Sequence, residues 1–388
     1  MDKVKVVHII TKLELGGAQE NTLFTVMHLR RDRYTPVLIS GSEGILVEEA
    51  QQLREGELHL VPELAREIRP LKDIIALFKL TKILTQLRRT AAIIVHTHSS
   101  KAGILGRWAA CLAGSKVIIH SVHGFSFNDF QPQLVRAFYI FLERITSRIT
   151  TRFIAVSQAN IEKGIEERIF KRDQVVLIRS GIEIEKYYHV KPERAEKRKE
   201  LGIDATIPLV AMIACFKPQK SPLDFVKVAK RVSDEVDQVK FLLVGDGILR
   251  PKIEALIKEY QIEDKVMLLG WRRDIPEIMG CIDIVVLTSR WEGLPRVFPQ
   301  AMASGVPVVA TGVDGAPEAI HHGVNGFLVP PGDSEGIVEK VLFLIQHPES
   351  ARAMGKEGRR LVKEFAIEKM MTQQEELYEM LLAQGRDR

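Results

Sequence analysis

The chain has 388 residues and a mass of 43.8 kDa, more than one hydrophobic core usually serves, so we expect two domains. Hydrophobic residues (46%) and charged residues (27%) occur without a biased tract, which excludes fibrous and disordered proteins. The net charge of +5 is uneven, because residues 1–190 hold 27 Lys and Arg against 20 Asp and Glu, while the rest holds 28 against 30. A basic first half suits an anionic membrane surface or a phosphorylated substrate, and scattered solubilising charge explains it as well.

The longest unbroken apolar run, Leu209–Phe216, is far shorter than the roughly 20 residues of a membrane-spanning helix. The first residues enter a strand pattern without a signal segment, so we expect a cytoplasmic protein. Cys111, Cys215 and Cys281 lie far apart and have no metal-ligand spacing, which predicts reduced and mostly buried cysteines.

Short runs of Val, Ile and Leu alternate with helical patterns along the chain. Such runs are typical of parallel strands buried on both faces, so we expect an α/β protein with two doubly wound, Rossmann-like sheets. The predicted strands are Val4–Ile10, Thr35–Ile39, Ile93–Thr97, Val117–Val122, Phe153–Val156 and Val175–Ile178, then Leu209–Ile213, Lys240–Val244, Val266–Leu269, Ile284–Leu287, Val308–Thr311 and Gly326–Val329.

The charged stretch Lys186–Gly202 has no strand signal and divides the two sheets. We therefore expect domains at 1–186 and 187–366, followed by a terminal helix at 367–388. Ligands of open parallel sheets bind at the carboxyl ends of the strands, so functional residues should lie in the loops that line a cleft between the domains.

In the first half, Gly16 and Gly17 stand directly before a helical pattern, where the backbone can approach an anion. Taken alone, the pair is better explained by a tight turn without a ligand. His96, His98 and His123 end the next strands, and His123, beside a glycine, is the better functional candidate, since buried neutral histidines explain the other two as well. Without an Asp-x-Asp motif or a carboxylate at ligand spacing, we expect no metal site.

In the second half, Lys217 and Lys220 follow a strand in a proline-containing loop and can hold a pyrophosphate by charge-assisted hydrogen bonds. Solvated loop lysines are the alternative. Gly245–Gly247 and Gly270–Arg272 end the next two strands, where the backbone can meet a flat ligand.

The most specific stretch is Thr288–Ala310, a strand, a glycine-containing loop, a helix and a second strand. Glu292 in the loop can accept hydrogen bonds from sugar hydroxyls, and Gly293 and Leu294 can offer N–H groups to a phosphate at the helix start. We expect Gln300 two turns inside that helix.

These motifs resemble the retaining nucleotide-sugar glycosyltransferases of family 4, which have the GT-B fold and include capsule and lipopolysaccharide enzymes. The resemblance implies that the first domain binds the acceptor, the second binds the donor, and the last helix packs on the first domain. It extends over essentially the whole chain through Gly16–Gln19, His98–Gly103, Val122–Phe125, Ala155–Ser157, Ser180–Glu183, Lys217–Lys220, Val244–Gly247, Glu292–Ala301 and Phe365–Tyr378.

The resemblance implies roles for matching residues. Glu292 would contact the donor sugar, Lys220 the pyrophosphate and Gln300 the ribose, while His123 would lie near the donor sugar. The residues implied to be catalytic are His123, Glu292 and Lys220. The residues implied to bind the donor are Gly16, Gly17, Lys217, Gly245, Asp246, Trp271, Gly293, Leu294, Pro295 and Gln300. The candidates on the acceptor side are Gln19, His98, Ser99 and Lys101.

Two positions depart from the family pattern. Gln300 stands where the family has a second glutamate, which weakens ribose binding by about 1 kcal/mol. Cys215 stands where an arginine usually precedes the loop lysine, and cysteine cannot replace a bidentate phosphate clamp. We expect Lys217 to supply the second positive charge.

The resemblance also implies the reaction and the partners. The donor would be a nucleotide-diphosphate sugar, expected to be a UDP-hexose or UDP-N-acetylhexosamine, and the acceptor a saccharide or polyprenyl-diphosphate-linked saccharide of cell-surface polysaccharide synthesis. No metal, cofactor or nucleic acid is expected. A nucleotide-sugar epimerase or phosphorylase and a catalytically silent sugar-nucleotide-binding subunit are the alternatives; a dehydrogenase is disfavoured because no Gly-x-Gly-x-x-Gly follows the first strand.

Residues 131–153 resemble a basic amphipathic helix. Such a helix suits peripheral docking on the anionic inner face of the cell membrane, and an apolar side packed in the protein core is the alternative that we favour. Its basic residues are Arg136, Arg144, Arg148 and Arg152, interleaved with Phe138, Tyr139, Phe141, Leu142 and Ile145.

Overall fold

A computed structural model describes residues 3–53, 56–188 and 194–386. Residues 189–193 of the charged stretch predicted between the sheets lie outside the described residues. The chain forms two compact units, unit 1 (Met1–Ser180 with Glu368–Arg388) and unit 2 (Gly181–Ile367). It therefore enters unit 2 at Gly181 and returns to unit 1 at Glu368.

Unit 1 is built on a seven-stranded parallel sheet with the order β3-β2-β1-β4-β5-β6-β7. The order reverses beside β1, as in doubly wound sheets. The strands are β1 (Val4–Ile10), β2 (Tyr34–Ser40), β3 (Glu57–Leu60), β4 (Ile93–His98), β5 (Val117–Val122), β6 (Arg152–Ala155) and β7 (Val175–Leu177).

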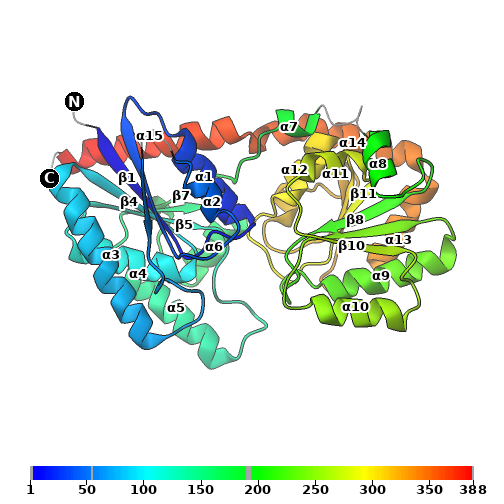
Figure 1. Cartoon of the computed structure of the whole chain (residues 1–388), viewed down its shortest axis with the longest axis horizontal. Helices are drawn as coiled ribbons and strands as arrows, with labels where there is room; N and C mark the ends of the chain where they lie inside the picture. Colours follow the sequence, from blue (N-terminus) through cyan, green and yellow to red (C-terminus); the bar gives the residue numbers. More distant parts are fainter. Residues whose placement is uncertain (1–2, 54–55, 189–193, 387–388) are drawn as a thin grey trace. The chain divides into compact units, whose positions relative to one another are not determined.

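Helices cover both faces of this sheet (Figure 1). Residues of α4 pack against the face that carries Thr97 and His120, while Tyr378 of the last helix contacts His96 on the opposite face. The helices are α1 (Gly17–His28), α2 (Val47–Ala50), α3 (Pro70–Thr90), α4 (Ser100–Leu112), α5 (Gln133–Ser147), α6 (Gln158–Glu166) and α15 (Ile367–Arg386), with a 3₁₀ turn at Arg172–Gln174.

Unit 2 is built on a six-stranded parallel sheet with the order β10-β9-β8-β11-β12-β13. Its strands are β8 (Leu209–Ile213), β9 (Lys240–Val244), β10 (Val266–Gly270), β11 (Ile284–Leu287), β12 (Val308–Thr311) and β13 (Gly326–Val329). Its helices are α7 (Glu185–Tyr188), α8 (Arg194–Glu200), α9 (Pro222–Glu235), α10 (Arg250–Glu259), α11 (Ile275–Cys281), α12 (Val297–Ser304), α13 (Ser334–Gln346) and α14 (Pro348–Leu361), with 3₁₀ turns at Ala316–Glu318 and Val362–Phe365.

The two doubly wound sheets predicted from the sequence are confirmed, and each predicted strand lies within one residue of an observed one. The short strand β3 was missed because its glutamate and histidine interrupt the apolar pattern at the edge of the sheet. The helix predicted over 131–153 is too long, since α5 ends at Ser147 and β6 already pairs with β5 from Arg152. Cys111 is exposed rather than buried. In the part of the chain that the structure describes, no helix is long and apolar enough to span a bilayer.

Candidate active site

Two loops of unit 2 bring Lys220 and Glu292 together. Lys220 follows β8 and Glu292 follows β11, and these strands are neighbours in the sheet. Lys220 Nζ donates to Glu292 Oε1 at 2.5 Å, and Ser289 Oγ donates to the same oxygen at 2.6 Å. Glu292 is buried and Lys220 is half-buried. Two hydrogen bonds, one of them from a cation, therefore fix the orientation of this carboxylate.

Two further side chains hold the Glu292 loop, and sequence reasoning missed both. The Glu292 N–H donates to Asp314 Oδ2 at 2.6 Å, and Gln219 Nε2 donates to the Trp291 carbonyl at 3.0 Å. Asp314 follows β12 in an Asp-Gly pair, so its position at a strand end was a signal that could have identified it. Gln219 stands beside Lys220 but gave no signal of its own.

The Gly245 turn after β9 requires glycine. Gly245 has a φ of 126°, and a Cβ there would lie 2.0 Å from the Ala214 carbonyl oxygen. The Asp246 carboxylate accepts from the Gly247 N–H at 2.7 Å and from Arg250 Nη1 at 2.9 Å. Asp246 therefore holds its own turn, which accounts for an acid at this position without a ligand.

The remaining predicted residues of unit 2 lie in the same set of loops or at the start of α12. Lys217 is half-buried in the loop after β8, and Trp271 is exposed after β10. The buried segment Gly293–Pro295 precedes α12. The prediction that Gln300 lies two turns inside the helix is wrong, because α12 begins only three residues earlier and Gln300 belongs to its first turn.

In unit 1, the glycine pair stands at the start of α1, which begins at Gly17. Gly16 has an extended backbone, and a Cβ there would lie 2.8 Å from the Gln19 side-chain oxygen. All three residues are half-buried. Gln19 thus folds back toward the backbone of the glycine loop, at the end of the helix where free N–H groups favour an anion.

Ser99 and Lys101, two acceptor-side candidates, are engaged within unit 1. Ser99 has a φ of 59°, unusual for a residue other than glycine, and its Oγ lies 2.7 Å from Thr11 Oγ1. Lys101 Nζ lies 2.6 Å from an Asp73 carboxylate oxygen. Ser99 therefore links the loops after β4 and β1, and Lys101 is paired with the first turn of α3.

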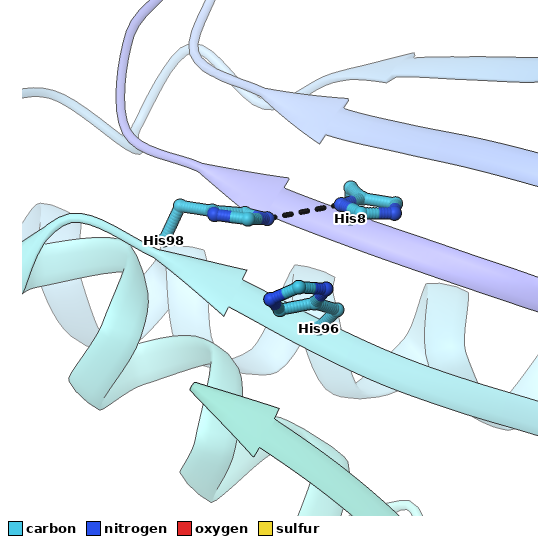
Figure 2. A group of neighbouring side chains, drawn as sticks. All are labelled: His8, His96 and His98. Atoms are coloured by element: carbon cyan, nitrogen blue, oxygen red, sulfur yellow. Dashed lines mark hydrogen bonds between the residues drawn. The ribbon is translucent and has the colours of Figure 1, made fainter. Parts of the chain in front are cut away.

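His98 connects two other histidine rings. Its Nε2 lies 2.9 Å from His8 Nδ1, a bond that Figure 2 shows, and its Nδ1 lies 3.2 Å from His123 Nε2. His8 was not a predicted site residue, although it is paired in register with His96 on the neighbouring strand. The structure thus brings His98 and His123 together and adds His8 to them.

His96 has a different environment. Its Nδ1 lies 2.7 Å from the Tyr378 hydroxyl and its Nε2 lies 2.7 Å from Ser121 Oγ. Both ring nitrogens are therefore satisfied inside the core, which is the structural interpretation that the sequence left open for this residue. Through Tyr378, His96 also attaches α15 to the sheet of unit 1.

Burial keeps five histidines of unit 1 neutral, namely His8, His96, His98, His120 and His123. It lowers the pKa of His8 to about 3 and of His123 to about 4, because an imidazolium loses its hydration there. The pKa values of His96, His98 and His120 lie well below the ordinary value for the same reason, and the neighbouring basic groups lower them further.

A small pocket lined by both polar and apolar side chains lies beside His98 and His123 in unit 1. Its volume of about 10 Å³ is close to what one water molecule needs. Asn21, Ser121 and Gln374 are among the other residues that line it. Asn21 is buried, and neither atom of its amide group has a hydrogen-bond partner among the described residues.

Comparisons with known proteins agree on one family. Residues 193–361 match the model of glycosyl transferases group 1, and residues 15–186 match the model of Glycosyltransferase Family 4.

The chain is 30% identical over 380 residues, 97% of both chains, to the UDP-Gal:alpha-D-GlcNAc-diphosphoundecaprenol alpha-1,3-galactosyltransferase of Escherichia coli. It is 28% identical to the N,N'-diacetylbacillosaminyl-diphospho-undecaprenol alpha-1,3-N-acetylgalactosaminyltransferase of Campylobacter jejuni, over 77% of this chain and 80% of that protein. Among solved structures, Anabaena Alr3699/HepE in complex with UDP and glucose has a TM-score of 0.83 at 22% identity and covers 97% of this chain and 99% of its own.

The buried histidines predict how stability depends on pH. In the unfolded chain their pKa returns to about 6.5, so between pH 6.5 and about 3 the unfolded state binds more protons and the free energy of unfolding falls as the pH falls. Each fully buried histidine contributes up to about 1.4 kcal/mol per pH unit.

Urea unfolding at pH 7.5, 6.0 and 5.0 measures this slope. We expect His120→Asn to reduce it and His28→Asn, a change at an exposed histidine, to leave it unchanged. An unfolding free energy that is constant from pH 7.5 to 5.0 would contradict the neutral state of these rings.

Proposed function

Because the chain belongs to the family 4 and group 1 glycosyltransferases and has their GT-B fold, we propose that it transfers a hexose or N-acetylhexosamine from a UDP-sugar to a polyprenyl-diphosphate-linked saccharide, with retention at the anomeric carbon. The observation that carries this proposal is the pairing of Lys220 with the buried Glu292 at the carboxyl ends of β8 and β11. Such strand ends are where open parallel sheets bind ligands.

Lys220 and Glu292 suit the two ends of a nucleotide-sugar. The Lys220 ammonium is available to a diphosphate, which attracts it more strongly than one carboxylate because it bears more charge. Glu292 then accepts hydrogen bonds from sugar hydroxyls, with Ser289 still holding one of its oxygens. The N-terminus of α12 favours the phosphates by its N–H groups and dipole.

In the proposed mechanism no protein nucleophile is needed. The departing phosphate oxygen helps to deprotonate the acceptor hydroxyl on the same face of the sugar, and the protein contributes positioning and stabilisation of the charge on the leaving diphosphate. With Cys215 in place of the family's arginine, Lys217 supplies the second positive charge from the same loop as Lys220.

The proposed donor and acceptor follow the relatives. The names of the Escherichia coli and Campylobacter jejuni enzymes specify undecaprenyl-diphosphate-linked acceptors, the former also specifies UDP-galactose, and the Anabaena structure contains UDP. Chemistry of this kind serves cell-surface polysaccharide synthesis on the inner face of the cell membrane. Sequence identity of about 30% supports the class of substrate rather than one sugar.

A lipid-linked acceptor lies in a bilayer, and α3 has a surface that suits contact with one. Leu71, Ile74, Ile75 and Phe78 recur at helical spacing and are exposed, Leu71 at 80% and Phe78 at 70%. Exposed basic side chains lie along the same helix. A basic amphipathic face of this kind favours an anionic membrane surface.

The sequence suggested α5 for this role, with its apolar side either packed in the core or exposed to a membrane, and the helix has apolar residues in both positions. Ile140 is buried in the core, while Leu134, Phe138 and Phe141 are exposed. Its positive charge is partly neutralised, because Arg136 and Arg144 both pair with Glu167. We therefore propose that α3 provides the main contact with the membrane and α5 a weaker one.

Replacing either member of the charged pair should lower turnover. We expect Glu292→Ala or Lys220→Ala to reduce kcat with a UDP-sugar by about a hundredfold or more, the scale of single electrostatic contacts in active sites. Product formation with a lipid-linked acceptor is the measurement. Glu292→Gln retains the shape of the side chain, and Lys230→Ala, which removes a half-buried lysine paired with Asp234, serves as the control.

Because breaking a buried ion pair can cost about 3–5 kcal/mol of stability, thermal unfolding of each variant must accompany the assay. Folded Glu292→Ala or Lys220→Ala protein with wild-type turnover would refute this site.

Chelation should leave the reaction intact, since the proposed stabilisation of the diphosphate comes from protein cations and N–H groups. Initial rates before and after dialysis against EDTA are expected to agree within about twofold. A rate that collapses and returns on addition of Mg²⁺ or Mn²⁺ would exclude the metal-independent mechanism.

Binding to vesicles tests the α3 surface. We expect the protein to sediment with vesicles that contain phosphatidylglycerol, and the double variant Leu71→Glu/Phe78→Glu to bind at least about tenfold more weakly, since each buried side chain contributes about 1.5–3 kcal/mol. Ile248→Glu, which alters a 76% exposed side chain of unit 2, is the matched control. Equal sedimentation of all three proteins would contradict the role of α3.

A further inference from the structure

Three histidine rings in unit 1 form one chain of hydrogen bonds, and we propose that His8 and His98 are positioning residues that determine which nitrogen of His123 carries its proton. His123 is the residue that the proposed function places near the donor sugar, so the effect on activity rests on that function. The coupling of the three protons does not rest on it.

The three hydrogen-bonded histidines lie on adjacent elements of the sheet. His8 lies on β1, His98 ends β4, and His123 follows β5. Figure 2 shows the His8 and His98 rings pointing toward one another, with the ring of His96 beside them. The two bonds use His8 Nδ1 with His98 Nε2, and His98 Nδ1 with His123 Nε2.

Each of these bonds needs one proton between two nitrogens, and a neutral imidazole carries only one. If His98 holds its proton on Nδ1, then His8 must hold its own on Nδ1 to supply the first bond, and His123 must leave Nε2 bare and carry its proton on Nδ1. If His98 holds its proton on Nε2, all three rings carry it on Nε2. The three hydrogen-bonded rings therefore have two neutral arrangements, all Nδ1–H or all Nε2–H, and they change tautomer together.

The surroundings keep the rings neutral. Burial lowers the pKa of all three, as described above. Asn21 and Thr22 of α1, Ser121 of β5 and Gln374 of α15 line the adjoining pocket, and these side chains are uncharged. No carboxylate among the described residues makes a hydrogen bond to any of the three rings. An imidazolium would therefore have no opposite charge beside it.

The two ends of this row of hydrogen-bonded histidines, His8 and His123, differ. His8 Nε2 is buried without a partner among the described residues, so it is sealed from water. His123 Nδ1 has no bond within the described structure either, but His123 is half-buried and lines the pocket. The state of the buried end thus determines whether His123 offers a ligand an N–H donor or a bare nitrogen that accepts a hydroxyl proton.

A metal ion is the alternative occupant, because ligand atoms of His8, His96 and His98 lie within 4.8 Å of one another. The hydrogen bonds of these rings disfavour a bound metal ion. Both nitrogens of His96 are bonded to Tyr378 and Ser121, and His8 Nδ1 and His98 Nε2 are bonded to each other. A divalent ion would have to break these bonds and would be buried without an anionic ligand.

Nitrogen NMR of the full-length protein labelled with ¹⁵N-histidine tests the coupling directly, because Nδ1–H, Nε2–H and doubly protonated rings have distinct shifts. At pH 7.5 we expect His8, His98 and His123 to be neutral and to share one tautomer. Different tautomers among the three, a protonated ring, or bound zinc detected by atomic emission would overturn the proposal.

Variants test the direction of control. In His8→Leu, we expect the His123 signals to become a mixture of both tautomers. We also expect kcat to fall about tenfold, which is the scale of effect for residues that orient a functional group by a hydrogen bond without touching the substrate. His8→Asn retains a hydrogen-bonding group near Nδ1 and should keep kcat within about threefold. His120→Leu changes a buried histidine that bonds to Thr97 and not to His8, His98 or His123, and it should leave the His123 signals unchanged.

If His8→Leu does not fold, the wild-type tautomers still decide the proposal. If no sugar transfer is found in any protein but the three rings share one tautomer, the proposed function fails and the coupling stands. Unchanged His123 signals and kcat in folded His8→Leu would overturn the positioning role.

Discussion

A carboxylate in a buried position must be matched by a cation and hydrogen-bond donors, and Glu292 imposes this constraint on unit 2. Lys220 and Ser289 meet at one of its oxygens, while Asp314 accepts from its N–H. Each of these partners follows a strand of the sheet, so the side chain and the backbone N–H of one residue, Glu292, link the loops after β8, β11 and β12. Those loops form the edge at which a diphosphate and a sugar are proposed to bind.

Unit 1 solves a different problem with uncharged groups. Its sheet places histidines on adjacent strands, where a charged ring would be destabilised by burial. The rings instead make hydrogen bonds to one another, to Ser121 and to Tyr378, and of these rings His8 Nε2 alone is buried without a partner among the described residues. The two units thus fix their polar groups in different ways, unit 2 by an ion pair and unit 1 by hydrogen bonds between uncharged groups.

Much of the fold could be predicted from the sequence because buried parallel strands are continuous apolar runs. Strand β3 could not, since its alternation of polar and apolar residues is that of an exposed edge. Lys220 and Glu292 were predicted from their loops, and the structure brings their side chains together.

Gln219 and His8 were missed because their roles depend on which strands are neighbours, and local sequence patterns do not reveal the strand order. Asp314 was missed although its position after a strand was a local signal. Lys101 and Asp246 were also selected because they follow strands, and the structure pairs each with a nearby residue of opposite charge, Asp73 and Arg250 respectively. A charged residue in a strand-end loop is therefore a weak signal until its partners are known.

The central claim is that the Lys220 loop holds the diphosphate of the donor. Isothermal titration with UDP, free of any acceptor or membrane, tests it most directly. We expect the wild-type protein to bind UDP, and Lys220→Ala to bind at least about tenfold more weakly, the equivalent of one charge-assisted hydrogen bond of about 1.5–3 kcal/mol. Equal affinity for UDP in the wild type and in folded Lys220→Ala, or no binding by either, would contradict the claim.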